Sequence, residues 1–275
     1  MSIPPSGATA RRPASGYFRT GLPYNRLGRG PRPLVVVQGL LFENKPQPRF
    51  ALGPYSFLRE RYTVYVVLRR PGMPQGYTLR DMAGDCAATI RRELGGPVDV
   101  VGVSTGGSIV QHLAADHPDV IRRLVIHSSA YTLSPSAKRL QSRVGELARD
   151  RRWTAASELL VDAVVPRRGI PAPARSLIVW PVSRMMTWFG RPGDPSDLVI
   201  TIAAEDAHDF RDRLGEITAP TLVIAGADDP FYTEALFRET AVGIPGAKLI
   251  LYPGMGHPAH GKQFARDVLA FLGGP

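Results

Sequence analysis

The sequence predicts an α/β protein built on one doubly wound, mostly parallel β-sheet that carries a helical insertion. Three observations lead to this fold. Short runs that are apolar on both faces recur along the chain, as expected for strands buried in a parallel sheet. Helical patterns separate these runs, so strands and helices alternate. The interval between residues 130 and 219 breaks this alternation, because it holds helical patterns but no convincing strand.

The predicted elements follow one another in a regular order. Residues 16–29 are compatible with one or two short edge strands. The apolar runs expected to form buried strands are 34–37, 64–68, 98–103, 124–126, 221–225 and 249–251. Between them, helical patterns cover 78–94, 105–116, 231–241 and 261–272. The long interval adds helical patterns over 134–150, 153–164, 174–189 and 196–213.

These patterns divide the chain into a tail, a core and an insertion. Residues 1–15 contain two arginines with no apolar segment behind them, which predicts a disordered tail and argues against a secretory signal. Residues 16–130 and 214–275 would form the α/β core. Residues 131–213 would form the helical insertion between two core strands, rather than an independent domain.

Composition bounds the class of protein. Of the 275 residues, 44% are hydrophobic and 21% charged, which is typical of a globular protein with a large core. The absence of an apolar run of about 18 residues argues against a transmembrane helix. With Cys86 as the only cysteine, no internal disulfide can form, and a cytoplasmic location is the default expectation.

The net charge of +10 raises the question of nucleic-acid binding. The arginines are scattered as pairs over different predicted elements, with no continuous basic block and no interleaved aromatic residues. We therefore expect no nucleic-acid site, although the charge leaves an anionic substrate or partner open.

Residues 102–106, with the sequence GVSTG, stand between a predicted strand and a predicted helix. A serine flanked by glycines at this spacing is the nucleophile-elbow pattern. The turn forces the serine into a strained backbone conformation, and Gly102 and Gly106 let strand and helix approach closely. Ser104 is therefore the candidate nucleophile, and it needs a base because a hydroxyl is a weak nucleophile at neutral pH.

The candidate base is His257, which follows the last apolar run on a glycine-rich loop. Loops at the carboxyl ends of strands are where α/β sheets gather functional groups. His260, three residues later, is the rival. The two histidines could also form a metal-binding pair, but no further ligands cluster nearby, so we expect no metal site.

An orienting acid should stand at the end of another strand. Asp228 and Asp229 both follow the run that ends at residue 225. We choose Asp229 because it precedes a proline that fixes the turn into the next helix, whereas Asp228 could cap that helix or point outward.

With Ser104, Asp229 and His257 in this order, the chain resembles the α/β-hydrolase superfamily over roughly residues 16–272. The stretch APTLVIAGADDP, from residue 219 to 230, looks like the acid-bearing strand and turn of that family. There the acid usually stands three residues after the glycine, which again selects Asp229. The resemblance implies the α/β-hydrolase fold and a helical cap formed by the insertion.

The resemblance also implies two backbone donors for an oxyanion hole, the N–H groups of Thr105 and Leu40. Family members commonly carry His-Gly in the loop after the first buried strand, whereas this chain has Gln38-Gly39. This departure leaves the backbone donor in place and leaves the subclass open.

A serine nucleophile disfavours haloalkane dehalogenase and epoxide hydrolase chemistry, which use a carboxylate. We expect a serine esterase that cleaves a small or medium apolar carboxylic ester through an acyl-enzyme on Ser104, with His257 as base and Asp229 as orienting acid. Thioester hydrolysis, acyl transfer, carbon–carbon bond hydrolysis and cofactor-free perhydrolysis on the same triad are alternatives. A non-catalytic small-ligand-binding protein is the alternative of another class.

Six apolar or aromatic residues are candidates for the substrate pocket, although ordinary packing competes as an interpretation for each. They are Leu41, Phe42, His127, Trp180, Met185 and Trp188. We expect a small-molecule acyl substrate, no cofactor, and a monomer or homodimer.

Overall fold

The computed structural model describes residues 14–165 and 171–274. Its strands are β1 (Ser15–Tyr17), β2 (Pro23–Leu27), β3 (Arg32–Val37), β4 (Tyr62–Val67), β5 (Val98–Val103), β6 (Ile121–His127), β7 (Thr221–Gly226) and β8 (Lys248–Tyr252). The tail expected over residues 1–15 falls almost entirely outside the described residues, and Ser15 already begins β1.

The helices alternate with the strands and then gather between β6 and β7. They are α1 (Leu79–Thr89), α2 (Thr105–Asp116), α3 (Pro135–Arg149), α4 (Trp153–Val164), α5 (Ala172–Gly190), α6 (Ser196–Asp206), α7 (Glu234–Gly243) and α8 (Lys262–Gly273). A 3₁₀ helix, η1 (Arg49–Leu58), precedes β4, and a π-helical turn, η2 (Ile90–Leu94), continues α1. Within the described residues, no helix is both long and apolar enough to cross a membrane.

The strands form one sheet in the order β1-β2-β4-β3-β5-β6-β7-β8. The edge strand β1 pairs antiparallel with β2, and β2 also pairs antiparallel with β4. Every other neighbouring pair is parallel. The predicted doubly wound, mostly parallel sheet is therefore confirmed.

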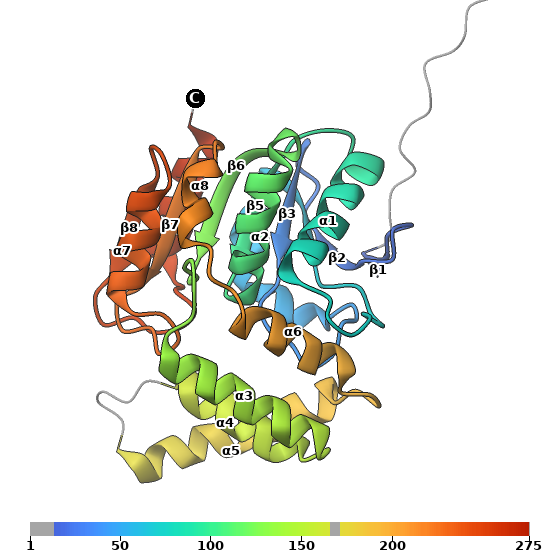
Figure 1. The fold of residues 1–275 in the computed structure, drawn as a ribbon, viewed down its shortest axis with the longest axis vertical. Coiled ribbons are helices and arrows are strands. Elements are labelled where there is room, and N and C mark those ends of the chain that lie inside the picture. Colours follow the sequence, from blue (N-terminus) through green and yellow to red (C-terminus); the bar gives the residue numbers. More distant parts are fainter. Residues whose placement is uncertain (1–13, 166–170, 275) are drawn as a thin grey trace, which may run out of the picture.

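Helices cover both faces of the sheet, which explains why the strands are apolar throughout (Figure 1). In β3, Val35 and Val37 pack in the core that contains α1, α2 and α7. Leu34 and Val36, which point the other way, pack in the core that contains η1 and α8. Burial on both faces removes the polar alternation that a one-sided sheet would show.

The helices α3 to α6 occupy the interval between β6 and β7, where helices without strands were expected. Figure 1 shows α3, α4 and α5 lying together beyond one end of the sheet. α3 packs against α4 and α6, and α4 packs against α5. Phe42, in the loop after β3, inserts among Val144, Trp153 and Ile202 of these helices and joins them to the core. Its ring centroid lies 5.7 Å from that of Trp153.

Two helix boundaries differ from prediction. The helix expected over 196–213 ends at Asp206, because the His208 and Phe210 rings turn inward and pack with His112 on α2. The helix expected over 231–241 begins only at Glu234. The carbonyl of Phe231 accepts from the N–H of Ser134 at 3.0 Å rather than from a following helical turn, and Thr233 caps the helix.

Candidate active site

Ser104 joins β5 to α2 in a strained conformation, with φ 53° and ψ −125°. Its backbone N–H donates to the carbonyl of His127, 3.0 Å away. The two glycines are required by close packing. A Cβ at Gly106 would lie 2.1 Å from the carbonyl oxygen of Val37, and one at Gly102 would lie 2.5 Å from the carbonyl oxygen of Gly106. The sharp turn holds the serine at the carboxyl end of the central strand.

His257 and Asp229 meet at the carboxyl ends of β8 and β7. The distance from His257 Nδ1 to Asp229 Oδ2 is 2.7 Å, and the Asp229 side chain is fully buried. A carboxylate only accepts hydrogen bonds, so Nδ1 carries the proton and Nε2 is left as the basic nitrogen. The other oxygen, Asp229 Oδ1, accepts from the backbone N–H groups of Phe231 at 2.9 Å and Tyr232 at 3.2 Å.

The rivals of these two residues lie nearby but make different contacts, and His260 also lines the cavity of Ser104 and His257 that is described below. Asp228 is exposed, and its backbone N–H donates to the carbonyl of Met255 at 3.0 Å. His260 is also exposed, and its Nδ1 lies 3.0 Å from the carbonyl oxygen of Pro258. Gly226 allows the loop before His257 to pack on the end of β7, because a Cβ there would lie 2.1 Å from the Met255 carbonyl oxygen.

The loop after β3 lies directly beside the serine. A Cβ at Gly39 would lie 3.1 Å from the Cβ of Ser104. The Gln38 side chain accepts a hydrogen bond from the Tyr55 hydroxyl at 2.8 Å. Burial raises the pKa of Tyr55 well above its usual value, so the phenol stays protonated and can donate. The buried guanidinium of Arg69 donates from Nη1 to the carbonyls of Gln38 at 3.1 Å and Gly39 at 2.9 Å.

A cavity of about 940 Å³ brings Ser104, Leu40 and His257 to one space. Among the described residues, the Ser104 hydroxyl makes no hydrogen bond and stands free in this cavity. Much of the wall is apolar and comes from the loop after β3, η1, α4, α5 and α8. Lys262 is the only lysine or arginine among the described residues of the wall. The cavity is large enough for a drug-sized apolar substrate.

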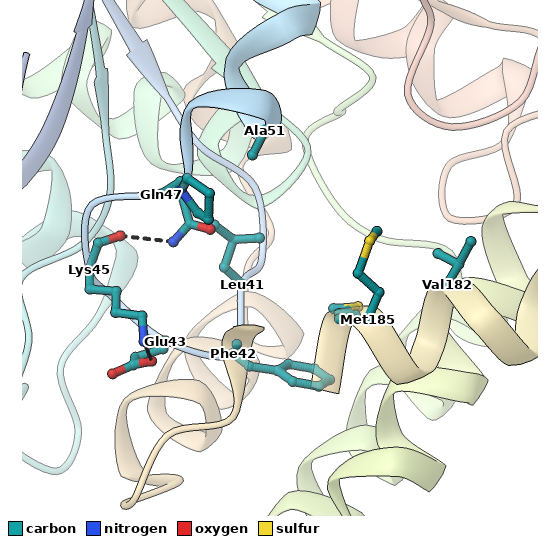
Figure 2. Close-up of a pocket in the computed structure, with 11 residues that line it drawn as sticks. Leu41, Phe42, Glu43, Lys45, Gln47, Ala51, Val182 and Met185 are labelled. Atoms are coloured by element: carbon teal, nitrogen blue, oxygen red, sulfur yellow. Dashed lines mark hydrogen bonds and ion pairs between the residues drawn. The ribbon is translucent and has the colours of Figure 1, made fainter. Parts of the chain in front are cut away.

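A smaller, mostly apolar pocket of about 270 Å³ adjoins this cavity and shares Leu41, Ala51 and Met186 with it. In Figure 2, Val182 and Met185 come from α5, and Leu41 and Phe42 come from the loop after β3. Lys45 and Glu43 form an ion pair at its edge. The smaller pocket therefore continues the apolar surface of the larger cavity beyond the part that Ser104 lines.

The predicted pocket residues separate into two groups. Leu41 lines both spaces, Phe42 and Met185 line the smaller pocket, and His127 lines the larger cavity. The imidazole of His127 is buried, stacks on Phe264 with ring centroids 4.4 Å apart, and has its pKa lowered to about 3 by burial.

The structure does not bring the two tryptophans to the cavity. Trp188 is 82% exposed, and Trp180 is 60% exposed with the Arg184 guanidinium 5.4 Å from its ring. The interpretation of these tryptophans as pocket residues is corrected here, because they lie on the outer side of α5. Met186 lines the cavity in their place.

Glu205, on α6, is a buried acid at this site that the sequence analysis missed. Its carboxylate is fully buried and accepts hydrogen bonds from the hydroxyls of Thr105, Ser108 at 3.2 Å and Tyr232 at 3.1 Å. Burial raises the pKa of Glu205, and these hydroxyls and the charge of Arg69 counteract the rise. In the sequence, the only signal is an acid next to the last residue of a largely apolar helical stretch.

Metal-ligating side chains do not gather at the site. Within residues 14–165 and 171–274, no group of three histidine, cysteine, aspartate or glutamate side chains is placed to hold a metal ion. His257 is engaged by Asp229, and His260 points to a backbone carbonyl.

Comparison with known proteins gives matches over most of the chain. A family model described as the alpha/beta hydrolase family matches residues 34–270. Among solved structures, the enol-lactonase from Burkholderia xenovorans LB400 superposes with a TM-score of 0.72 and 25% identity, over 92% of this chain and 96% of that one.

Curated relatives also match at the level of sequence. A protein of Klebsiella pneumoniae named "Putative carbamate hydrolase RutD" is 26% identical over 188 residues, which is 67% of this chain and 68% of the relative. A 2-hydroxy-6-oxononadienedioate/2-hydroxy-6-oxononatrienedioate hydrolase of Cupriavidus pinatubonensis is 47% identical over 96 residues, which is 33% of each chain.

Proposed function

Since this chain belongs to the alpha/beta hydrolase family, we propose that it is a serine hydrolase that cleaves a small or medium apolar carboxylic ester through an acyl-enzyme on Ser104. The observation that carries the proposal is the 2.7 Å contact between His257 Nδ1 and Asp229 Oδ2 at the cavity that Ser104 lines. Binding alone would not need a strained serine, a histidine and a buried acid at one cavity.

In the proposed mechanism, His257 Nε2 takes the proton of the Ser104 hydroxyl as Ser104 Oγ attacks the ester carbonyl. The N–H groups of Leu40 and Thr105 then stabilise the oxyanion. His257 returns the proton to the leaving alcohol, and a water deprotonated by His257 hydrolyses the acyl-enzyme. Asp229 stabilises the imidazolium in both steps. The unbonded Ser104 hydroxyl fits this scheme, because catalytic hydrogen bonds often tighten only when substrate binds.

The insertion supplies part of the substrate site in this proposal. Leu160 and Val161 of α4, Met186 of α5 and Gln141 of α3 line the cavity. We therefore treat residues 131–213 as a helical cap that covers the site and selects the substrate. The apolar wall favours an uncharged substrate.

Carbon–carbon bond hydrolysis is a second candidate, favoured by the 47% identity with the Cupriavidus hydrolase over 96 residues. The name of that relative describes a substrate with two carboxylates. Lys262 is the only lysine or arginine that the described wall of this cavity offers to such charges. This difference favours the uncharged ester.

The test is an assay of p-nitrophenyl esters of increasing acyl length with wild type, Ser104→Ala, His257→Ala and His260→Ala. We expect Ser104→Ala and His257→Ala to lower kcat/KM by about 10³-fold or more. We expect His260→Ala to keep kcat within about twofold, because the Nδ1 of that ring contacts the Pro258 carbonyl and not an orienting carboxylate.

A 2-hydroxy-6-oxodienoate offered alongside the esters tests the second candidate. Labelling of Ser104 by a fluorophosphonate tests for the activated nucleophile. Full ester hydrolysis by Ser104→Ala would overturn the mechanism. Absence of both hydrolysis and labelling in folded wild type would favour a non-catalytic binding protein.

A further inference from the structure

Arg69 stands two residues after the end of β4 and fixes the orientation of the loop after β3. Its side chain is buried, and Nη1 donates to the carbonyls of both Gln38 and Gly39. The carbonyl of one residue and the N–H of the next belong to the same planar peptide and point in opposite directions. With the Gly39 carbonyl held by Arg69, the N–H of Leu40 is turned to the opposite side, away from the guanidinium.

Glu205 holds the segment that carries the other backbone donor, the N–H of Thr105. Its carboxylate accepts the hydroxyls of Thr105 and Ser108, which lie in the first turn of α2. The Ser104 carbonyl accepts from the N–H groups of Gly107 at 2.6 Å and Ser108 at 3.3 Å. The N–H of Thr105 shares a peptide with that carbonyl, so it points out of the helix. Glu205 therefore anchors the turn that presents this donor.

The two buried charges lie close enough to affect each other. Burial lowers the pKa of the Arg69 guanidinium to about 10, so it is charged at neutral pH, and the Glu205 carboxylate acts against that shift. Asp197, on the same helix as Glu205, accepts the N–H groups of Gly72 at 3.0 Å and Met73 at 2.9 Å. Thus α6 holds the chain that follows β4 as well as the start of α2.

Neither charge is part of the described wall of the cavity, so neither is placed to touch substrate. We propose that Arg69 and Glu205 are positioning residues that hold the two oxyanion donors, Leu40 and Thr105, in the same orientation relative to Ser104. The inference rests on the proposed function, since it requires an oxyanion to form there. Preorganised donors stabilise the transition state more than the substrate, so loss of this support should lower kcat with little effect on KM.

The experiment compares Arg69→Met, Arg69→Lys and Glu205→Gln with wild type. We expect kcat for the best p-nitrophenyl ester to fall about 10–100-fold in Arg69→Met and Glu205→Gln, with KM within about twofold. Affinity for a boronic acid, which forms a tetrahedral adduct with the serine, should fall in parallel with kcat. Affinity for the product carboxylic acid should not change. Arg69→Lys should recover part of kcat, because its ammonium can still donate to one of the carbonyls.

A matched control removes a different buried pair. Arg122 of β6 binds the fully buried carboxylate of Asp99, with Nε 2.8 Å from Oδ1, at the ends of the strands opposite the active site. Arg122→Met should lower the melting temperature and leave kcat and boronate affinity within about twofold of wild type.

The outcomes separate positioning from bulk stability. A lowered melting temperature with unchanged kcat, as in the control, would overturn the inference, and so would a rise in KM alone. If Arg69→Met does not fold, kcat, KM and boronate affinity of the nearly isosteric variant Glu205→Gln provide the test. A wild type that neither turns over esters nor labels with fluorophosphonate would overturn the proposed function and this inference together. An active wild type with unaffected variants would overturn the inference alone.

Discussion

Asp228 and Asp229 carry the same carboxylate one residue apart, and only their surroundings separate them. Asp229 is buried between His257 and two backbone N–H groups, which fix its rotamer. Asp228 is exposed on the same turn. The proline at position 230 fits the choice of Asp229, because its ring stiffens the turn. The two backbone N–H groups that donate to the Asp229 carboxylate follow directly after this proline.

Asp229→Asn should lower kcat by about 10³–10⁴-fold, because an amide at this position favours the wrong imidazole tautomer and cannot stabilise the imidazolium. The measurement is kcat on the preferred ester, with circular dichroism to check folding. Asp228→Asn is the matched control, and we expect it to stay within about twofold of wild type. Equal losses in the two variants would count against Asp229 as the orienting acid.

The predicted pocket residues show that residue type alone does not determine which side chains line the cavity. Leu41 and Met185 line the spaces near the site, whereas Trp180 and Trp188, on the same helix as Met185, face outward. Side chains on one helix point in different directions around its axis. The sequence of α5 has few polar residues that would mark its exposed side, so the direction of each side chain could not be predicted. Met186, next to Met185, was missed for the same reason.

At the scale of elements, the turn between β5 and α2 is determined by contacts that leave no room for a side chain. The helix start lies against β3, so a Cβ at Gly106 would overlap the backbone carbonyl of Val37. Backbone atoms cannot move aside as a flexible side chain can. The spacing of Gly102 and Gly106 is therefore explained by the close packing of β3, β5 and α2 at this turn.

Gly106→Ala should lower the free energy of unfolding by about 3 kcal/mol, because the methyl group forces α2 and β3 apart. It should also reduce kcat, since α2 carries Ser104 and Thr105. Urea unfolding measured beside ester turnover checks both effects. Gly84→Ala, on α1 with open space around its Cβ, is the control and should stabilise by about 0.5–1 kcal/mol. A stable, fully active Gly106→Ala would refute the packing argument.

Helix boundaries were less predictable than helices. The first turn expected in α7 does not form, and the carbonyl of Phe231, which a helix would pair with the N–H of residue 235, accepts from the N–H of Ser134 at 3.0 Å instead. Thr233 then caps the helix, with its side chain accepting from the N–H of Leu236 at 3.3 Å. A hydrogen bond to a residue about a hundred positions earlier thus contributes to where this helix begins, and periodicity along the chain does not show such a contact.

At the scale of the whole molecule, buried histidines make stability depend on pH. Burial lowers the pKa of His208 to about 3 and that of His112 to about 4, and their ring centroids lie 5.4 Å apart. In the unfolded chain both have a pKa near 6.5, so below about pH 6.5 the unfolded state binds more protons. Their contribution to stability is therefore complete above about pH 6.5 and is lost as the pH falls toward about 4 and 3.

When the pH is lowered from 7 to 5, the titration of His208 alone should reduce the free energy of unfolding by about 2 kcal/mol. His208→Phe keeps the aromatic stacking on Phe210 and removes the titration. We expect its unfolding free energy to vary less with pH than that of wild type, measured by urea unfolding at both pH values. An identical pH dependence in the two proteins would show that the acid sensitivity arises elsewhere.

The sequence by itself determined the architecture and indicated Ser104 as the candidate nucleophile. Runs that are apolar on both faces require a sheet covered on two sides, and the glycines around Ser104 mark a turn that tolerates no side chain. Both are local properties, since each follows from residues within a few positions of one another. The order of strand ends then predicted that Asp229 and His257 would lie near this turn, and in the structure His257 and Ser104 line one cavity.

Only the tertiary structure decided which groups surround these residues. Arg69 and Glu205 are 136 residues apart, since 205 − 69 = 136, yet both are buried behind the loop and the turn that would bind an oxyanion. Likewise, the direction of each α5 side chain depends on how the insertion packs on the core. A charge is tolerated in the interior only where distant segments bring it hydrogen-bond partners, and no pattern along the chain records which segments will meet.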